Sequence, residues 1–493
     1  MIAVQLIIVA GIILWIRFLW NRRKLYMLMW KLPGSMGLPF IGIAANYFLF
    51  YKRKMSIRTK YMDKNGSTIL TWMGTLPIIM TRDPKVAEDV YMAPLCINRN
   101  LHSTKAMALC MGSGLVTLQG DKWLERRKQM TPAFKHNVLI SFLPIFNAET
   151  KTLVALLDSY VDQGEKYILP DLTRWSFRIS TQTTVGTDVK EDEHFNNDLI
   201  LESYQSLLRL TTLNVLIPFL QIKIISKLLG YEKQRQKDVS NVYQMFDKIL
   251  DKKLNSRTEI DWKPELKTVI NRTIELFRNG GIPFEEVKGE CMSMVVAAFE
   301  TTAETVFHTL VLLAMFPKFQ DMVFHELKEL FPSTGDFEVT YEDLLKMDYL
   351  ERVVNETLRL IPSLPMVSRE TTDDLLLSNG VIIPKGVTIL IDIFNIHRNT
   401  DVWGPEAAVF NPDNFLPDRI RDKHPFAFIP FSKGKRNCIG WKYGMMSTKL
   451  ALTKILRNFE VSTTFRYEDL EFVDTLIMKL AQSPPLSFQR RKS

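Results

Sequence analysis

The decapeptide Phe-Ser-Lys-Gly-Lys-Arg-Asn-Cys-Ile-Gly occupies residues 431–440, and Cys438 is its chemical centre. Gly434 and Gly440 flank the cysteine, and glycine lets a backbone turn tightly and approach a flat surface closely. Arg436 precedes Cys438 by two residues, so an extended loop directs both side chains to one side. A basic neighbour lowers the pKa of a thiol and favours the thiolate, which is the form that ligates metal.

One thiolate, one cation and an apolar shield from Phe431 suit a haem iron that takes a single protein ligand. Structural zinc needs four ligands, and no second Cys or His lies near Cys438 in the sequence. The alternative for an isolated cysteine is a small buried apolar residue. The complete pattern Phe-x-x-Gly-x-Arg-x-Cys-x-Gly rarely arises by chance, so we predict that Cys438 is an iron ligand.

This stretch resembles the haem-binding loop of the cytochrome P-450 family, the haem-thiolate monooxygenases, and the resemblance extends over nearly the whole chain. It implies a mainly α fold with a small β region and a non-covalent haem b. The implied reaction inserts one oxygen atom from O2 into a small apolar substrate such as a fatty acid, a hormone-like lipid or a xenobiotic. NADPH electrons would come from a partner reductase, with cytochrome b5 as a further partner. Insect members of the fatty-acid ω-hydroxylase clan look most similar.

The N-terminus predicts a membrane anchor. Residues 1–20 are apolar except for Gln5 and Arg17, and a helix of this length is close to the hydrocarbon thickness of a bilayer. Basic residues follow the apolar run, which is the reverse of a cleaved signal peptide and favours a cytosolic body. Residues 21–45 form a basic flank and a Pro/Gly hinge, and residues 46–493 form the catalytic domain. We expect an endoplasmic reticulum, microsomal location.

Composition limits the other classes of protein. Four cysteines without a CxxC pair argue against a disulfide framework. The net charge of +9 reflects either solubility and the basic residues after the apolar N-terminus, or a basic face for an acidic partner or anionic lipid. No nucleic-acid-binding module is recognisable, so no nucleic-acid partner is expected. Residues 211–229 are apolar but interrupted by polar residues, so they predict either an interfacial segment or part of the core.

Trp123 and Arg127 lie four residues apart on a predicted helix over residues 120–132 and therefore share one face. Without further evidence, Trp123 and Arg127 are consistent with a surface helix that has an aromatic ridge and a basic ridge. The family resemblance implies that both contact a haem propionate, and it assigns the same role to Arg369. It also places Arg436 and Phe431 against the haem.

The longest predicted helix covers residues 285–316 and carries Glu300 and Thr301 at its centre. One interpretation is a solvated glutamate and a threonine bonded to the preceding turn. The resemblance instead implies the oxygen-activation element, in which Glu300 relays protons and Thr301 positions dioxygen and water. Ala298 replaces the usual glycine. Ala297 stands where many clan members carry a haem-esterifying glutamate, so covalent attachment is not expected.

Glu356 and Arg359 are three residues apart on a predicted helical run over residues 340–360, which usually means a surface ion pair. The resemblance implies a buried pair that supports the cysteine loop. Its usual third partner is an arginine, and Asn414 stands at that position. The predicted network therefore closes with an amide or is weaker. Hairpins are expected over residues 68–81 and 472–480.

Two other functions remain open at this point. A haem-thiolate isomerase or dehydratase works on peroxides without a reductase, and such members tend to lose the acid–threonine pair that Glu300 and Thr301 retain. A non-catalytic haem- or lipid-binding protein of the membrane surface is the alternative from a different class. Oxygen consumption that depends on NADPH and reductase separates it from an oxygenase.

Overall fold

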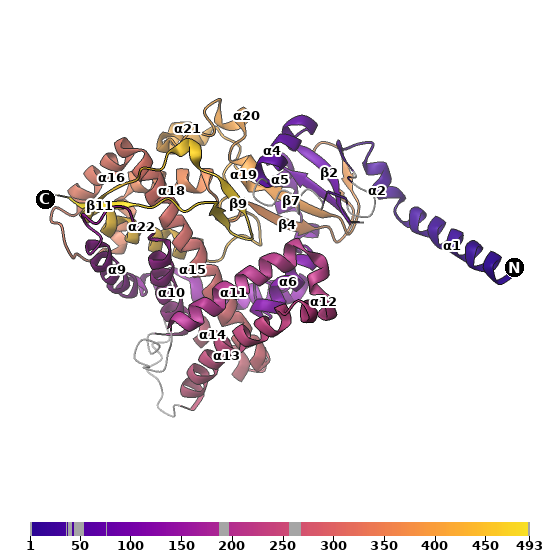
Figure 1. The fold of residues 1–493 in the computed structure, drawn as a ribbon, viewed down its shortest axis with the longest axis horizontal. Coiled ribbons are helices and arrows are strands. Elements are labelled where there is room, and N and C mark those ends of the chain that lie inside the picture. Colours follow the sequence, from indigo (N-terminus) through magenta and orange to yellow (C-terminus); the bar gives the residue numbers. More distant parts are fainter. Residues whose placement is uncertain are drawn as a thin grey trace.

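The structure is a computed structural model that describes residues 2–35, 37, 42–43, 54–74, 76–186, 197–255 and 268–491. Helices form most of the body, and the largest sheet lies at the end from which the N-terminal helix projects (Figure 1). The prediction of a mainly α fold with a small β region is confirmed.

The described helices are α1 (Ile2–Asn21), α2 (Arg23–Leu28), α4 (Lys54–Asn65), α5 (Pro84–Met92), α6 (Leu101–Met111), α7 (Gly120–Met130), α8 (His136–Ile140), α9 (Leu143–Asp158), α10 (Leu169–Val185), α11 (Asn197–Leu216), α12 (Lys223–Leu228), α13 (Tyr231–Asn255), α14 (Val269–Arg278), α15 (Phe284–Met315), α16 (Pro317–Leu330), α17 (Tyr341–Lys346), α18 (Asp348–Leu360), α19 (Ile393–Ile396), α20 (Thr400–Trp403), α21 (Pro417–Arg421) and α22 (Trp441–Asn458). Short 3-10 turns are η2 (Pro94–Cys96), η3 (Thr131–Phe134), η5 (Pro218–Gln221), η6 (Pro412–Phe415) and η7 (Tyr467–Asp469).

The described strands are β1 (Gly34–Ser35), β2 (Thr68–Met73), β3 (Leu76–Thr81), β4 (Met366–Glu370), β5 (Leu375–Leu376), β6 (Ile382–Ile383), β7 (Thr388–Asp392), β8 (Phe459–Ser462), β9 (Phe472–Asp474), β10 (Met478–Leu480) and β11 (Ser487–Arg490). The largest sheet has the order β1-β2-β3-β7-β4. β2 and β3 are the expected hairpin, with Thr68 opposite Thr81. β9 and β10 are the expected late hairpin, with Leu480 opposite Phe472. β4 pairs antiparallel with β7, which places Arg369 opposite Ile389.

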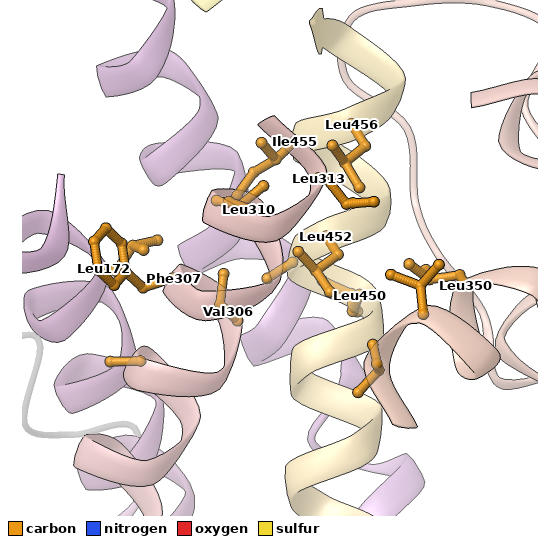
Figure 2. Close-up of a cluster of buried hydrophobic side chains, with 14 of the residues drawn as sticks. Leu172, Val306, Phe307, Leu310, Leu313, Leu350, Leu450, Leu452, Ile455 and Leu456 are labelled. Carbon is orange, nitrogen blue, oxygen red and sulfur yellow. The ribbon is translucent and has the colours of Figure 1, made fainter. Parts of the chain in front are cut away.

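The core is centred on α15, which packs against α10, α18 and α22. Figure 2 shows Phe307 and Leu310 of α15 among leucines of those neighbouring helices. Leu172, Leu350 and Leu452 are completely buried there. Burying one such side chain contributes about 1.5–3 kcal/mol, so this layer fixes the central helix rigidly. α15 matches the predicted helix, shifted by one residue at each end.

The run over residues 340–360 is two helices rather than one. Thr340 and Asp343 form the predicted capping box at the start of α17. Met347 then leaves the helical region with φ −85° and ψ 69°, and α18 begins at Asp348. The break gives α18 its own direction, and Glu356 and Arg359 lie in its second half.

Helix α1 projects away from the body (Figure 1), and its apolar side chains are exposed, as at Trp15 and Trp20. Within the described residues, two helical stretches are long and apolar enough to cross a membrane, His136–Asp158 and Phe284–Met315. Their apolar windows are 50% and 83% buried within the protein, which is typical of core helices. A shorter apolar stretch, Val9–Trp20, belongs to α1.

The segment expected to be a hinge makes contact with the body. Leu28 and Leu32 are buried in a cluster that includes Ile79 and Ile389 of the sheet. β1 pairs parallel with β2 through Gly34–Ser35. Residues 36, 38–41 and 44–53 lie outside the described residues, and part of the predicted 21–45 segment is among them.

Candidate functional site

The loop that carries Cys438 is held by its own backbone and by α5. The N–H of Cys438 donates to the carbonyl oxygen of Phe431 at 2.9 Å. Ser432 and Gly434 have φ angles of 59° and 72°. A Cβ at Gly434 would lie 2.3 Å from the carbonyl oxygen of Tyr91, so only glycine fits there. The predicted tight, glycine-dependent loop is therefore present.

The Cys438 thiol has an unusual environment. The Cys438 side chain has accessible surface, yet the surrounding protein desolvates the thiol and raises its pKa. This combination is expected of a thiol that borders an internal space. A backbone hydrogen bond from Gly440 and the charges of Arg127 and Arg99 act in the opposite direction and lower this pKa. The effect that the sequence attributed to Arg436 thus comes from two other arginines. Among the described residues, no group of three or more His, Cys, Asp or Glu could hold a metal ion.

Arg436 points away from the thiol toward α7. Its guanidinium donates to the carbonyl oxygens of Ile97 and Leu118, at 3.1 and 2.5 Å. It also lies 4.7 Å from the ring centroid of Trp123, which is buried. A guanidinium stacked on an indole is a favourable cation–π contact. Two of the predicted haem contacts, Trp123 and Arg436, therefore touch each other.

Arg127 connects the same helix to the cysteine loop. Its guanidinium donates to the backbone oxygen and the side-chain oxygen of Asn437, at 2.9 and 2.8 Å. Trp123 and Arg127 do share one face of α7, as their spacing predicted. Burial lowers the pKa of Arg127, and the Cys438 thiol opposes this shift.

Four arginines, Arg99, Arg127, Arg369 and Arg436, gather around the loop without a carboxylate partner among the described residues. Arg369 and Arg436 are 2% and 5% exposed. Burial followed by mutual repulsion lowers the pKa of Arg99 to about 10 and that of Arg436 to about 8. The Nε atoms of Arg99 and Arg436 are buried without a hydrogen-bond partner.

Guanidinium groups that are held inside a protein without a carboxylate partner are costly and call for an anion. Carboxylates suit them best because arginine binds a carboxylate through a two-pronged fork. The two propionates of a haem supply this chemistry beside a single thiolate. The residues present therefore fit a haem, and the fit rests on the arginine cluster and the exposed thiol.

Glu356 and Arg359 form a completely buried pair, with Arg359 Nε 2.7 Å from Glu356 Oε2. Arg359 also donates to the carbonyl oxygens of His397 and Ala407. Asn414 Nδ2 donates to Glu356 Oε1 at 3.1 Å, so the network closes with an amide. Asn414 takes the place of the arginine that the resemblance implied.

The ion pair reaches the cysteine loop through His397. The backbone N–H of Ile429 donates to His397 Nε2 at 2.9 Å, which leaves Nδ1 to donate to the carbonyl oxygen of Arg359 at 3.2 Å. Burial, assisted by the charge of Arg359, lowers the pKa of His397 to about 3, so the ring is neutral and one tautomer fits. Ile429 precedes Phe431 by two residues, and this chain of bonds positions the loop.

Glu300 and Thr301 lie in the middle of α15 with different surroundings. Glu300 is 5% exposed, and its Oε1 is 2.6 Å from Lys479 Nζ, so it does not lie on a solvated face. The Thr301 hydroxyl donates to the carbonyl oxygen of Ala297 at 2.8 Å, which is the bond to the preceding turn. Its oxygen retains lone pairs that can accept another hydrogen bond. Ala297 is exposed within this otherwise buried stretch.

Sequence reasoning missed four residues of this region: Arg99, Glu304, His308 and Lys479. Glu304 and His308 follow Glu300 at intervals of four on α15, and this helical spacing of polar groups could have indicated them. Arg99 and Lys479 come from distant segments, and no local pattern marks them.

Comparison with known proteins agrees with the fold and the loop. The family model described as Cytochrome P450 matches residues 32–487. The chain is 63% identical over 491 residues to probable cytochrome P450 313a2 of Drosophila melanogaster, with 100% of each chain covered. It is 61% identical over 487 residues to probable cytochrome P450 313a3 and 52% identical over 491 residues to probable cytochrome P450 313a1, both of the same organism, with 99% and 100% of each chain covered.

A family match over residues 32–487 and full-length relatives of the same family define the class of protein as a haem-dependent oxygenase. The chain belongs to the cytochrome P450 family, and it is a P450 monooxygenase.

Proposed function

We propose that this monooxygenase inserts one atom of O2 into a small apolar substrate and that Cys438 is the axial thiolate ligand of a non-covalent haem b. The arginine cluster beside the exposed Cys438 thiol carries this proposal. When bound, the haem supplies oxygen activation, and a thiolate ligand favours O–O cleavage. The substrate is a fatty acid, a hormone-like lipid or a xenobiotic.

The residues around the loop have distinct parts in holding the haem. Arg127, Arg369 and Arg436 would neutralise the propionates of a bound haem, and Trp123 supports Arg436 from α7. Arg369 reaches the loop itself, with Nη2 3.4 Å from Ser432 Oγ. Phe431 contributes an apolar side chain that keeps water from the sulfur. Ala297 offers no carboxylate for an ester.

Glu300 and Thr301 deliver protons to the reaction centre. Glu300 is the buried acid, and the Thr301 oxygen accepts a hydrogen bond while its hydroxyl continues to donate to the Ala297 carbonyl oxygen. A positioned proton donor contributes about a hundred- to ten-thousand-fold to a rate. Electrons come from an NADPH-dependent reductase, and cytochrome b5 is a second electron donor.

The protein works at the endoplasmic reticulum membrane with its body in the cytosol. Helix α1 is the anchor, and α12 adds a peripheral contact. Ile224 and Leu228 of α12 are 72% and 81% exposed, and Lys223 and Lys227 lie on the same short helix. Exposed apolar residues beside lysines suit an anionic lipid surface.

The experiment that tests this function compares Thr301→Ala with the unmodified protein. Binding spectra against fatty acids, terpenoids and steroids first select a substrate that the protein turns over. With reductase in excess, Thr301→Ala keeps haem and substrate binding but diverts NADPH electrons to hydrogen peroxide. Product formed per NADPH consumed measures the effect.

Thr309→Ala is the matched control. The Thr309 hydroxyl makes the same bond to the preceding turn, to the carbonyl oxygen of Thr305 at 2.8 Å, further along α15. Thr309→Ala therefore loses a similar bond without changing the yield of product. Equal yields in both variants would contradict the proton-delivery role. No oxygen consumption with NADPH and reductase across the whole lipid panel would contradict the proposed reaction.

A further inference from the structure

One charged cluster has more members than the proposed function uses. Lys479 of β10 places its Nζ 2.6 Å from Glu300 Oε1 and 3.5 Å from Glu304 Oε1. His308 Nε2 lies 3.4 Å from Glu304 Oε2. Positions 300, 304 and 308 are one helical turn apart and share a face of α15. A single ammonium from the late hairpin thus joins two carboxylates of the central helix.

The cluster is buried but incompletely hydrogen-bonded. Glu300, Glu304 and His308 are 5%, 2% and 1% exposed. Glu300 Oε2, Glu304 Oε2 and His308 Nε2 are all buried without a hydrogen-bond partner. Buried polar atoms are nearly always paired, and each exception costs stability. Three such atoms in one contact group are unexpected of a purely structural ion pair.

The charges of the cluster indicate that it retains one proton. Two carboxylates face one ammonium, and two close carboxylates that share a site tend to retain one proton. Burial raises the pKa of Glu304 to about 7, with Glu300 acting in the same direction and Lys479 opposing. Burial lowers the pKa of His308 to about 3, and Lys479 adds to this, so the imidazole stays neutral.

Lys479 remains charged in this setting. Burial lowers its pKa, but Glu300 and Glu304 raise it further, and the net shift is upward. Its side chain is 43% exposed, whereas those of both carboxylates are nearly inaccessible. Among the described residues, Lys479 and Glu300 are the charged groups that act on Glu304 from the elements packed around it.

We propose that Lys479 is a positioning residue that holds Glu300 and Glu304 around one shared proton, so that Glu304 is the reservoir for the proton that Glu300 delivers. This inference rests on the proposed proton-delivery role of Glu300 and Thr301. In the transfer, the proton leaves the Glu304 carboxyl group and binds the Glu300 carboxylate. Glu300 passes a proton on toward Thr301, bulk solvent at the exposed side of Lys479 supplies one replacement proton to Glu304, and no electrons move.

Infrared spectroscopy of the full-length haem-loaded protein tests the shared proton directly. A carboxyl C=O band assigned to Glu304 disappears in Glu304→Gln and titrates near pH 7 in the unmodified protein. Lys479→Met moves the midpoint of this band upward by about one unit or more, because an opposite charge at this distance is lost. Lys479→Arg retains the charge and leaves the midpoint near that of the unmodified protein.

Turnover of the substrate selected by the binding spectra provides the second measurement, with reductase in excess. Lys479→Met and Glu304→Gln increase hydrogen peroxide released per NADPH and reduce oxygenated product roughly tenfold, a smaller loss than removing the donor itself. Lys479→Arg restores the product yield. Lys449→Met is the control, since Lys449 of α22 pairs with Glu351 of α18 at 2.8 Å rather than with Glu300 or Glu304.

An unchanged infrared midpoint in Lys479→Met overturns the proposal, as does an unchanged product yield in both Lys479→Met and Glu304→Gln. If Lys479→Met fails to fold, Glu304→Gln alone decides between the outcomes. A carboxyl C=O band that still titrates near pH 7 in Glu304→Gln would exclude Glu304 as the group that holds the proton. The parent proposal fails separately, through an unchanged yield in Thr301→Ala. If Thr301→Ala changes the yield and the Lys479 and Glu304 variants do not, only the shared-proton inference fails.

Discussion

Asn414 Nδ2 donates a hydrogen bond to Glu356 Oε1 at 3.1 Å, at the point where the family pattern has an arginine. The same carboxylate oxygen accepts from the backbone N–H of Asn411 at 2.8 Å. Glu356 therefore has one charged partner, Arg359, and two neutral donors. A neutral amide supports the buried pair geometrically without adding a second positive charge.

Asn414→Ala should destabilise the protein modestly and Glu356→Ala severely. The first variant removes one hydrogen bond to a charged group, which costs about 1.5–3 kcal/mol. The second leaves the buried Arg359 unpaired, which costs about 3–5 kcal/mol. Urea unfolding monitored by haem absorbance measures both. Asp413→Ala is the control from the same turn, because its pair with Arg352 is partly exposed and costs about 0–1 kcal/mol. Equal losses for Asn414→Ala and Glu356→Ala would contradict this account of the network.

Removal of Met1 to Trp20 should release most of the protein from membranes while the body stays folded. The reason is that α1 projects from the body and the core clusters begin further along the chain, at Leu28. Vesicle flotation measures attachment, and haem absorbance reports folding. Ile224→Ser combined with Leu228→Ser should then remove the residual attachment through α12. Loss of haem from the truncated protein would show that α1 is part of the body.

Acid–organic extraction should separate all the haem from the polypeptide. The family resemblance implies that Ala297 stands where other members carry a haem-esterifying glutamate, and a methyl group cannot form an ester. The extracted polypeptide is therefore expected to be colourless, and the mass of the intact chain unchanged. A mass increase equal to one haem would mean that a different acid forms the bond.

Stability should depend on pH through Glu304. Burial raises its pKa from about 4.5 in the unfolded chain to about 7 in the folded protein, so the folded state binds this proton more tightly. The contribution of Glu304 to stability is therefore complete below about pH 4.5 and is lost as the pH rises through 7. Glu304→Gln has no proton to lose at this position. The melting temperature of the variant minus that of the unmodified protein should therefore be larger at pH 8 than at pH 6. The same difference at both pH values would contradict the raised pKa.

Local sequence patterns predicted those helices, hairpins and loops whose structure is determined by neighbouring residues. The capping box at Thr340, the hairpin from Thr68 to Thr81 and the long helix between two prolines were all legible because neighbouring residues determine them. The cysteine loop was legible for the same reason, since its glycines and Cys438 lie within ten residues. The break at Met347 was not, because nothing local marks where α18 turns to pack on α15.

Long-range contacts account for the rest. Arg99 reaches the thiol from a loop more than 300 residues away, and Lys479 reaches Glu300 from the late hairpin. The bond from Ile429 to His397 likewise depends on how two segments pack together. Charge and hydrogen-bond partners of this kind are determined by tertiary packing, which single-sequence patterns do not contain.

The most direct test of the central claim is the absorption spectrum of the reduced, carbon-monoxide-treated protein with and without Cys438→Ala. The account predicts a Soret band at the thiolate-shifted position in the unmodified protein, because Cys438 supplies the sulfur ligand. It predicts that this shifted band is absent in Cys438→Ala, even where the variant still binds haem through its arginines. Cys291→Ala, which changes a buried thiol far from the loop in sequence, should retain the shifted band. A thiolate-shifted band in Cys438→Ala would contradict the assignment of Cys438 as the iron ligand.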